Sequence, residues 1–389
     1  MKVIVVDITG RNAAQYNPSL CKAIGGNYPD DEIILLCPTL YDEPKYFKWI
    51  KLLSFVPKSI NDSSSTIKRI LRAFDIILNY IFLIHYAFKN KPDIIHFQWL
   101  PFLEVTGIEK HILSMIKRVS SHTKIALTVH NIYPHEMDDA KKAKFAKRFT
   151  KIGQYIDGYM VHLNGSRQLL SSIFNIQDNR IFLTYHGIYE AKGYESTKTT
   201  STNDRINIIL YGYQTKYKGA DILIEALKLM PPPCIEKIRT LIIGKSDMEM
   251  YSKYESIISS INTTWINKFV PEEELYHYIG KSDLILLPYR NITQSGVLLL
   301  ALSYRKPVLT SDLPSFKETL EGYPDDYFFE AGNPEALKNM LMRFINGGID
   351  INLQKKVIES LNHKYSWEKA GKSTMDAYRY LIMNSDSTN

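Results

Sequence analysis

The sequence contains few cysteines. Its 389 residues include three, Cys21, Cys37 and Cys234, and these are far apart in the chain. No disulfide framework and no metal-binding spacing can be read from them, which favours a reducing cytoplasm. The N-terminal MKVIVVDITG has the pattern of a strand followed by a glycine turn rather than that of a secretion signal. We therefore expect a cytoplasmic protein.

The chain also lacks an apolar run long enough to span a bilayer. Its longest such run, DIILNYIFLIHYAF at residues 75–88, is shorter than the roughly 20 residues that a spanning helix needs. The run also contains the polar residues Asp75, Asn79 and His85. A buried core helix is the expected structure, and contact with a membrane surface is the alternative.

Features of nucleic-acid-binding proteins are missing as well. The chain carries a net charge of +7 and 26 tyrosines, but it has no zinc-finger spacing and no RNP-like aromatic motif. Much of the positive charge is local, in KKAKFAKRFTK at residues 141–151. This segment is either a solvated helix face or a surface for anionic lipid or a diphosphate-bearing acceptor. We expect no nucleic-acid partner.

The sequence does contain a regular alternation of strand-like and helix-length segments. Most of the strand-like segments are near-continuous apolar runs, as is typical of parallel strands covered on both faces. They are KVIVVD, EIILLC, DIIHFQ, KIALTVH, GYMVHL and RIFLTY in the first half, and INIILYG, RTLIIG, WINKFV, DLILLPY and PVLTS in the second. The pattern predicts an α/β fold with two Rossmann-like parallel-sheet domains.

A polar stretch without apolar periodicity separates the two halves. Residues 191–204 are rich in Ser, Thr, Asn and Asp, which predicts a linker. The predicted domains are then residues 1–190 and 205–366, followed by a helical segment at 367–389. Two such sheets would face a central cleft, and ligands of these sheets bind at the carboxyl ends of the strands.

Two loops that follow strands of the second half predict a diphosphate site. In YGYQTKYKGADILIEAL, Gly212 permits a tight turn and Lys218 precedes the start of a helix. In PYRNITQSGVLLLALSY, residues 293–297 contain no acid and lead into a wholly apolar helix. A lysine and a helix N-terminus both attract phosphate. The alternatives are a surface lysine and an ordinary Ser or Thr N-cap.

These two loops resemble those of the donor-binding domain of GT-B glycosyltransferases, most of all glycosyltransferase family 4. FVPEEELYHYIGKSDLILLPY resembles the element that faces the nucleotide base, and YSWEKAGKSTMDAYRYL resembles the C-terminal helix that crosses back to the N-terminal domain. The resemblance covers essentially the whole chain and is strongest from 206 to 318. It implies that the donor is bound by Gly10, Gly212, Tyr213, Lys218, Phe269, Val270, Thr293, Gln294, Ser295, Gly296 and Val297.

The sequence departs from the family pattern at three positions. Tyr213 stands where the family usually has arginine, and Ile292 and Leu300 stand where it has two donor-binding glutamates. Aliphatic side chains cannot make those contacts. Either residues 293–296 hold the donor instead, with Gln294 or Thr293 in place of a carboxylate, or the chain has lost activity. We expect the first, because Lys218 and the rest of the donor loop are present.

Candidate residues of the first half also lie at strand ends. Three strands end near a histidine, and a lone histidine there is usually a hydrogen-bonded core residue, as we expect for His96 and His162. His130 is different, because the polar segment NIYPHE follows it. The resemblance implies that His130 faces the donor sugar and acts with Lys218 in catalysis. His186, next to the linker, is expected to shape the hinge.

The resemblance also places a glycine loop after the first strand, against the donor phosphates and the acceptor. Gly10 lies in this loop. The expected acceptor-side residues are Asn17, Asn131, His135 and Glu136.

The implied reaction is retaining transfer of a hexosyl group to a glycan or lipid-linked acceptor in polysaccharide biosynthesis. The donor is a nucleoside diphosphate sugar, with UDP-glucose as first choice and GDP-mannose as second. No Asp-x-Asp motif occurs, so the lysine and the helix dipole are expected to replace a divalent ion, and no cofactor or metal is expected. Peripheral contact with an anionic inner membrane face is a further expectation. A catalytically silent sugar-nucleotide-binding subunit and a GT-B-fold UDP-sugar epimerase are the alternatives.

Overall fold

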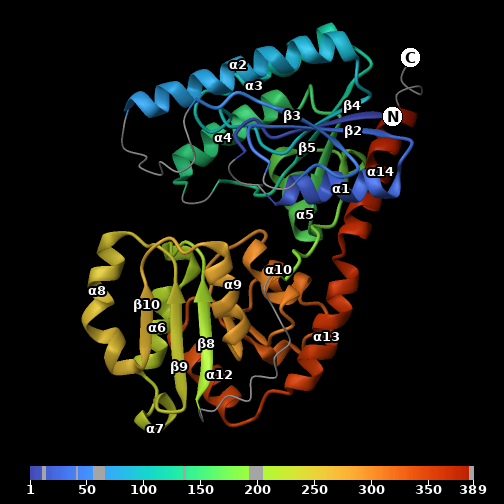
Figure 1. Ribbon diagram of the computed structural model, residues 1–389. Helices are drawn as coiled ribbons and strands as arrows, with labels where there is room; N and C mark the ends of the chain where they lie inside the picture. Colours follow the sequence, from blue (N-terminus) through green and yellow to red (C-terminus); the bar gives the residue numbers. More distant parts are fainter. Residues whose placement is uncertain (11–14, 41–42, 56–65, 135–136, 192–204, 385–389) are drawn as a thin grey trace. The chain divides into compact units, whose positions relative to one another are not determined.

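The protein divides into two compact units. A computed structural model describes the chain except for residues 11–14, 41–42, 56–65, 135–136, 192–204 and 385–389 (Figure 1). The first unit comprises residues 1–187 and 366–389, and the second comprises residues 188–365. Apart from residue 191, the predicted linker lies outside the described residues.

The first unit is built on a seven-stranded sheet in the order β3-β2-β1-β4-β5-β6-β7, and every pairing in it is parallel. The strands form where the sequence has short runs of β-branched and other apolar residues; in β1, for example, residues 3–6 are fully buried. The strands are β1 (Lys2–Val6), β2 (Glu32–Cys37), β3 (Lys48–Lys51), β4 (Ile94–Phe97), β5 (Lys124–Thr128), β6 (Gly158–Val161) and β7 (Ile181–Leu183).

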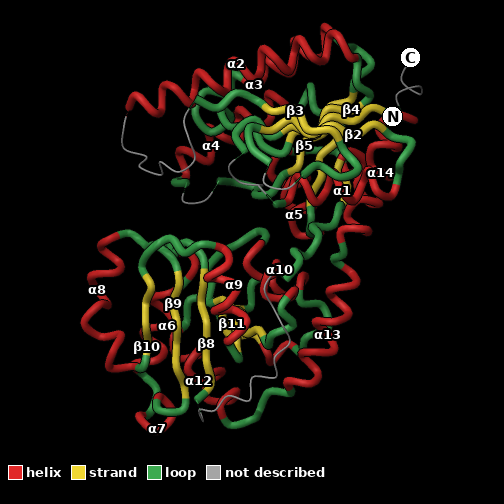
Figure 2. Tube along the Cα trace, viewed as in Figure 1, coloured by secondary structure: helices red, strands yellow, loops and turns green. Residues whose placement is uncertain are grey.

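Helices cover both faces of this sheet, as Figure 2 shows. The helices that share one hydrophobic core are α2 (Thr66–Asn90), α3 (Glu109–Val119), α4 (Asp139–Ile152) and α5 (Asn164–Phe174). The other core contains α1 (Tyr16–Asn27) and α14 (Trp367–Met383). These two helices pack closely, since a Cβ atom on Gly371 would lie only 3.0 Å from the backbone of Ala23. The C-terminal helix therefore belongs to the first unit, as the resemblance implied.

The prediction of a buried core helix at residues 75–88 is wrong. One side of α2 is indeed buried, but Phe74, Ile81 and Phe88 on the opposite side are 51%, 57% and 58% exposed. By length and composition the helix could cross a membrane. Only 28% of its most apolar window is buried inside the protein, so it is not a core helix. Periodicity alone could not distinguish this helix from one enclosed on all sides, because apolar residues occur all around it.

The second unit contains a six-stranded parallel sheet in the order β10-β9-β8-β11-β12-β13. Its strands are β8 (Ile206–Tyr211), β9 (Ile238–Ile243), β10 (Thr263–Ile266), β11 (Leu284–Leu287), β12 (Val308–Ser311) and β13 (Phe328–Phe329). Its helices are α6 (Ala220–Lys228), α7 (Pro232–Ile235), α8 (Met248–Ile258), α9 (Glu272–Lys281), α10 (Gly296–Ser303), α11 (Pro314–Thr319), α12 (Pro334–Ile345) and α13 (Ile351–Lys364). Both units thus have the parallel, Rossmann-like sheet that the sequence predicted.

The strand order fixes where a ligand can bind in each unit. The first strand of each sheet lies between the second and the fourth, so the order in which strands are added to the sheet reverses between β1 and β4 and again between β8 and β11, while all strands stay parallel. At such a switch point the two loops diverge and leave a crevice at the carboxyl ends of the strands. The loops after β8 and β11 are those that carry the predicted diphosphate site.

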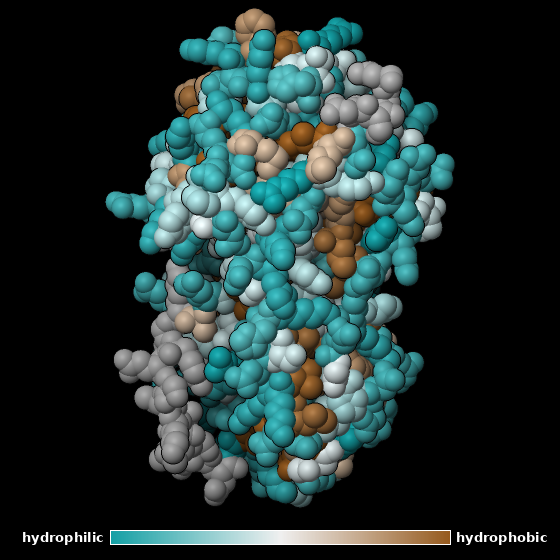
Figure 3. All heavy atoms as spheres, turned by 90° about the vertical axis from the view of Figure 1, so that its right-hand side faces the viewer, coloured by the Kyte–Doolittle hydropathy of each residue, from teal (hydrophilic) through white to brown (hydrophobic). Residues whose placement is uncertain are grey.

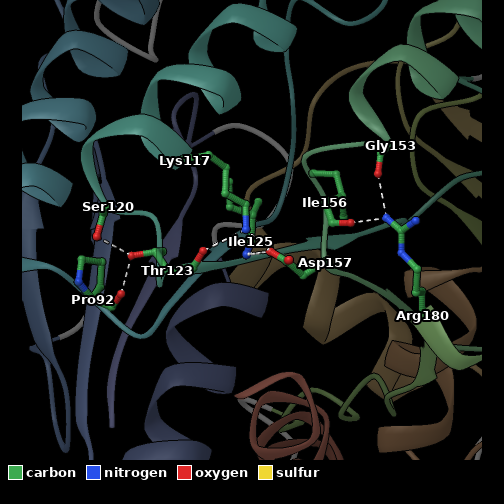
Figure 4. Close-up of polar contacts among 9 residues, drawn as sticks. All are labelled: Pro92, Lys117, Ser120, Thr123, Ile125, Gly153, Ile156, Asp157 and Arg180. Atoms are coloured by element: carbon green, nitrogen blue, oxygen red, sulfur yellow. Dashed lines mark hydrogen bonds and ion pairs between the residues drawn. The ribbon is translucent and has the colours of Figure 1, made fainter. Parts of the chain in front are cut away.

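The amino ends of β4, β5 and β6 are fixed by a polar network (Figure 4). The Asp157 carboxylate accepts from Lys117 Nζ at 2.5 Å and from the Ile125 amide at 2.6 Å. Thr123 Oγ1 donates to the Pro92 carbonyl, and Arg180 donates to the carbonyls of residues 153 and 156. These contacts join α3 and the end of α4 to the sheet, at the edge opposite the candidate site.

On the face drawn in Figure 3, hydrophilic residues predominate and hydrophobic residues are exposed in separate patches. Such a distribution is ordinary for a folded protein surface, because polar groups cannot cover all of it.

We predict that Asp157→Ala lowers the free energy of unfolding by about 1–3 kcal/mol, because it leaves the half-buried Lys117 ammonium and the Ile125 amide without their acceptor. Asp139→Ala is the control, since the Asp139 side chain is fully exposed in its ion pair with Lys142, and it should cost at most about 0.5 kcal/mol. Urea unfolding of the three proteins measures this, and equal losses in the two variants would contradict the assigned role.

Candidate active site

Lys218 lies in the loop after β8, and glycines make room for it. It ends a short 3₁₀ turn, Lys216–Lys218, and is 7% exposed. A Cβ atom on Gly212 would lie 2.5 Å from Lys218 Nζ, and one on Gly219 would lie 1.9 Å from the Pro288 carbonyl oxygen. Both glycines have positive φ, 103° and 75°. Any other residue at 212 would occupy the space beside the ammonium.

The Lys218 ammonium is buried without a neutralising partner. Among the described residues no carboxylate pairs with it, and the centroid of the Tyr289 ring lies 5.6 Å from Nζ. Desolvation lowers the pKa of Lys218 to about 8. The group is therefore mostly charged at pH 7, at an energetic cost that a bound anion would offset.

The N-terminus of α10 lies at the same place. Ser295 is its N-cap, and the Ser295 hydroxyl accepts from the Leu298 amide at 3.2 Å. The first amides of a helix have no partner within it, and at Gly296 an added Cβ would meet nothing within 4 Å. The serine hydroxyl is thus an ordinary cap, and the groups that remain available for a ligand are the amides of Gly296 and Val297.

The structure brings Gly212, Lys218 and Val297 together. A Cβ atom on Gly212 would lie 3.6 Å from Val297 Cγ2 as well as beside the lysine ammonium. The Tyr211 hydroxyl, at the end of β8, donates to the Val297 carbonyl at 2.8 Å. The lysine and the start of α10 therefore flank one point at the carboxyl end of β8.

An arginine that sequence reasoning did not single out holds the two loops together. Arg290, after β11, makes two hydrogen bonds of 2.8 Å to the Asp221 carboxylate in α6. The Arg290 guanidinium also donates a hydrogen bond of 2.6 Å to the Lys216 carbonyl, and the Arg290 backbone amide donates one of 2.7 Å to the Tyr217 carbonyl. On the other side of the loop, Ser315 Oγ donates to the Ile292 carbonyl at 2.8 Å. The loop is thus bound on both sides.

The remaining donor-side candidates of the second unit differ in their burial. Thr293 and Gln294 are half-buried in the loop that leads to α10. Tyr213 is 59% exposed. Phe269 is 76% exposed and Val270 is buried, and both follow β10, which β9 separates from β8. No recorded contact joins these two residues to the lysine, so their role as a base slot stays a prediction.

In the first unit, Asp7 organises the loop after β1. Its buried carboxylate accepts from the Gly10 amide at 2.8 Å and from Asn17 Nδ2 at 3.0 Å. Gly10 has a φ of 58°, as this turn requires. Asn17 is 2% exposed, so its place is inside the loop, not the acceptor-facing one that we expected. Asp7 was missed because it is the last residue of an apolar run.

His130 follows β5 and is half-buried within a group of aromatic rings. Its Nε2 lies 3.3 Å from Gln98 Oε1, which only accepts, so this nitrogen donates and Nδ1 carries the lone pair. The His130 ring is 5.2 Å from Tyr16 and 5.4 Å from His162 between centroids. His186 packs on the same tyrosine at 4.7 Å, and its expected role in shaping the hinge stays a prediction.

Burial keeps these histidines neutral. Desolvation, followed by the neighbouring imidazoles, lowers the pKa of His130 well below its usual value. Desolvation also lowers the pKa of His162 to about 4 and that of His96 to about 3. His96 is a hydrogen-bonded core residue, as expected, with Tyr378 Oη at 2.6 Å and Thr128 Oγ1 at 2.7 Å. His130 is therefore suited to orient a hydroxyl group through a neutral ring.

A small pocket, with a cavity volume of about 40 Å³, opens beside His130. Its deeper wall is apolar, with buried side chains such as Leu103, Leu127 and Phe149. Glu104 and Asn131 also line it, and desolvation raises the pKa of the Glu104 carboxyl. Asn131 was expected on the acceptor side and Glu104 was not; His135 and Glu136 lie outside the described residues. In the described parts of the chain, no three His, Cys, Asp or Glu side chains converge as metal ligands.

Known proteins that are similar to this chain include glycosyltransferases. The family "Glycosyl transferases group 1" matches residues 192–363. This match spans almost the whole of the second unit, residues 188–365. Over 253 residues the chain is 22% identical to the GDP-mannose:glycolipid 4-beta-D-mannosyltransferase of Xanthomonas campestris pv. campestris. That alignment covers 60% of this chain and 66% of the relative's length.

Solved structures match over nearly the whole chain. HepE of Anabaena, in complex with UDP and glucose, matches with a TM-score of 0.66 at 10% identity, over 97% of this chain and 98% of the other. The sucrose-phosphate synthase of Thermosynechococcus elongatus matches with a TM-score of 0.69 at 14% identity, over 99% of this chain and 100% of the other. The chain therefore has the GT-B fold, as its sequence predicted.

The depressed pKa of Lys218 predicts a particular pH dependence of stability. Between pH 8 and about 10.5, Lys218 binds more protons in the unfolded protein than in the folded protein. The free energy of unfolding therefore rises with pH in this range, because the buried side chain loses its charge. Lys218→Met removes the cost of burying the charge at every pH. Relative to Lys218→Met, we expect the wild type to gain up to about 3 kcal/mol over this range.

Denaturant unfolding at several pH values measures that gain. Lys216→Met is the matched control, because Lys216 is exposed in the same turn, and its stability difference from the wild type should not change with pH. A difference between wild type and Lys218→Met that is constant from pH 7 to 10.5 would show that Lys218 is not desolvated.

Proposed function

We propose that the protein is a retaining, metal-independent glycosyltransferase that moves a hexosyl group from a nucleoside diphosphate sugar to a glycan or lipid-linked sugar. The observation that carries this proposal is the unpaired, buried Lys218 ammonium beside the open start of α10. Together they form a positively charged site that is rich in hydrogen-bond donors and has no carboxylate among its described residues. A pyrophosphate supplies the negative charge and the acceptor oxygens that such a site lacks.

Lys218 and the amides of Gly296 and Val297 would act on the leaving group. When the sugar departs, negative charge grows on the oxygen of the β-phosphate. Fixed donors aimed at that oxygen stabilise the transition state more than the ground state, which is usually the largest catalytic term. Because Arg290 ties the two loops together, these donors need little rearrangement during the reaction. The same positive end of α10 supports charge development without a divalent ion.

His130 and the pocket beside it would bind the sugar-bearing side of the reaction. A neutral imidazole donates through one nitrogen and accepts through the other, which suits sugar hydroxyls. The acceptor proton passes to the departing phosphate oxygen on the same face of the sugar, so His130 orients groups and does not act as a nucleophile. Asn131 lines the same pocket and would contribute a further hydrogen bond.

UDP-glucose is the proposed donor and GDP-mannose the second candidate. The Anabaena structure that shares this fold holds UDP and glucose, whereas the Xanthomonas relative is named for GDP-mannose and a glycolipid acceptor. A thermal-shift screen with UDP-, GDP- and ADP-sugars separates these donors, because a ligand of the native state raises its apparent stability. That relative's name also specifies a beta linkage, so the anomeric configuration of the product tests retention directly. The proposed location is the cytoplasmic face of a membrane.

A catalytically silent sugar-nucleotide-binding subunit is the second candidate. It is favoured by Ile292 and Leu300, the aliphatic residues at the positions of the family's two glutamates. The two functions separate when the protein is incubated with UDP-glucose for hours and free UDP is measured. Binding without release of UDP, with and without acceptors, would support the silent subunit.

We predict that Lys218→Ala lowers kcat by about 10²–10³-fold, the usual effect of losing one donor to a developing oxyanion. Lys216→Ala, in the same turn but exposed, should change kcat less than about two-fold. Release of nucleoside diphosphate in the presence of acceptor measures both rates. An unchanged rate in Lys218→Ala would reject the phosphate assignment.

We predict that His130→Ala reduces transfer by about 10²-fold or more while leaving nucleotide affinity nearly unchanged. The reason is that His130 lies in the first unit, whereas the diphosphate groups proposed here belong to the second. His111→Ala, an exposed histidine of α3, is the control. Nucleotide affinity by calorimetry and transfer rate are measured on the same samples; if affinity falls first, His130 belongs to donor binding or to the fold.

A further inference from the structure

The outer side of α2 exposes a row of mostly apolar side chains with no partner among the described residues, and the exposed His85 lies in this row between Ile81 and Phe88. This outer side lies opposite the side that packs in the core, where Tyr80, Leu83 and Ala87 are buried. Figure 1 shows α2 as a long helix at the edge of the first unit. The exposed apolar side chains on α2 are Ile70 (63%), Leu71 (40%), Phe74 (51%), Ile77 (42%), Ile81 (57%), Phe82 (38%) and Phe88 (58%).

These side chains recur at the spacing of one helix face. Positions 70, 74, 77, 81 and 88 follow steps of three, four and seven residues, which places them in one row along the helix. At 1.5 Å per residue the row is about 27 Å long. Exposed apolar patches of this extent on a soluble protein mark an interaction surface.

The charges around the row identify what it fits. Exposed Arg69 and half-buried Arg72 lie near its first end, and exposed Lys89 and Lys91 lie at its last end. The single carboxylate of α2, Asp75, is buried on the inner side. An apolar row with cations at both ends and no exposed acid is the pattern of a helix that lies in the surface of an anionic bilayer.

The buried polar residues of α2 bond to the rest of the first unit, which argues against a helix that crosses a bilayer. Asn79 accepts from the Leu53 amide at 2.9 Å and donates to the Leu53 carbonyl at 3.0 Å. Asp75 accepts from the Phe55 amide at 3.0 Å. These contacts hold the 52–55 segment against the helix, and they keep its inner side within the protein. Leu53 and Phe55, 46% and 58% exposed, extend the apolar surface.

A second copy of the chain is a poorer occupant of this row. Pairing two such helices in parallel would place Arg69 next to Arg69, and antiparallel pairing would place Arg69 next to Lys89. Both arrangements bring like charges together at each end, which is destabilising. We infer that the outer side of α2, with Leu53 and Phe55, docks the protein on an anionic lipid bilayer. This surface is separate from the diphosphate site and does not depend on the proposed reaction.

Sedimentation of the full chain with phosphatidylglycerol-containing vesicles tests the inference. We expect binding that is strong at low salt, falls with added salt, and is much weaker on pure phosphatidylcholine. Phe74→Ser with Ile81→Ser should weaken binding by about ten-fold or more, because two apolar anchors are lost. Arg69→Glu with Lys89→Glu should weaken it and remove the salt dependence.

Met248→Ser is the matched control, since Met248 is 71% exposed in the second unit, and its vesicle binding should equal that of the wild type. The thermal shift caused by donor nucleotides should be the same in all these proteins, which shows that the variants are folded and separates this test from that of the transfer reaction. Two results would overturn the inference: no sedimentation of the wild type with anionic vesicles, or equal sedimentation of the Phe74 and Ile81 double variant. A dimer in solution that the same double variant dissociates would assign the row to a second copy instead.

Discussion

The burial of one ammonium group that has no counter-charge among the described residues is the constraint on which the second unit depends. A cation as buried as Lys218 loses most of its hydration, and the structure offers it an aromatic ring in place of a carboxylate. The fold tolerates this because Gly212 leaves space for the side chain and because the loops on either side are fixed from elsewhere. The Arg290–Asp221 pair joins the loop after β11 to α6. This pair acts together with the hydrogen bonds from Arg290 to the Lys216 and Tyr217 carbonyls and from Tyr211 to the Val297 carbonyl, which also hold the lysine loop near the start of α10.

The two units use the same strand order for different chemistry. In the second unit the switch point between β8 and β11 carries a fixed positive charge and a helix N-terminus. In the first unit the switch point between β1 and β4 carries Asp7, whose carboxylate accepts hydrogen bonds from its own loop. Around it lie histidines whose pKa values burial has lowered. A charged site suits the anionic part of a sugar nucleotide, and an uncharged polar site suits hydroxyl groups, because neither then needs a counter-ion from solvent.

The sequence predicted those features that depend on local patterns. Near-continuous apolar runs such as 206–211 became parallel strands, because only strands covered on both faces bury such runs completely. Lys218 could be found from its position between a glycine turn and a helix. The Arg290–Asp221 pair could not, because its members are 69 residues apart and neither stands in a motif. The grouping of Tyr16, His130 and His186 depends in the same way on α1 and two distant strand ends meeting in the folded unit.

Ile292 and Leu300 stand at the positions of the family's two glutamates. These aliphatic residues are consistent with the lowered pKa of Lys218. A carboxylate near the start of α10 would neutralise the ammonium in the empty site and raise its pKa, so that a ligand would have to compete with an internal ion pair. With aliphatic residues there, the free protein keeps a cation whose pKa is lowered to about 8, and only a ligand with its own negative charge relieves the cost of burying it. The diphosphate would then supply a larger share of the binding free energy than the sugar hydroxyls. Under the proposed function, selection among sugars would depend more on shape and on uncharged groups such as Thr293 and Gln294, since an amide or hydroxyl binds a sugar hydroxyl less strongly than a carboxylate does.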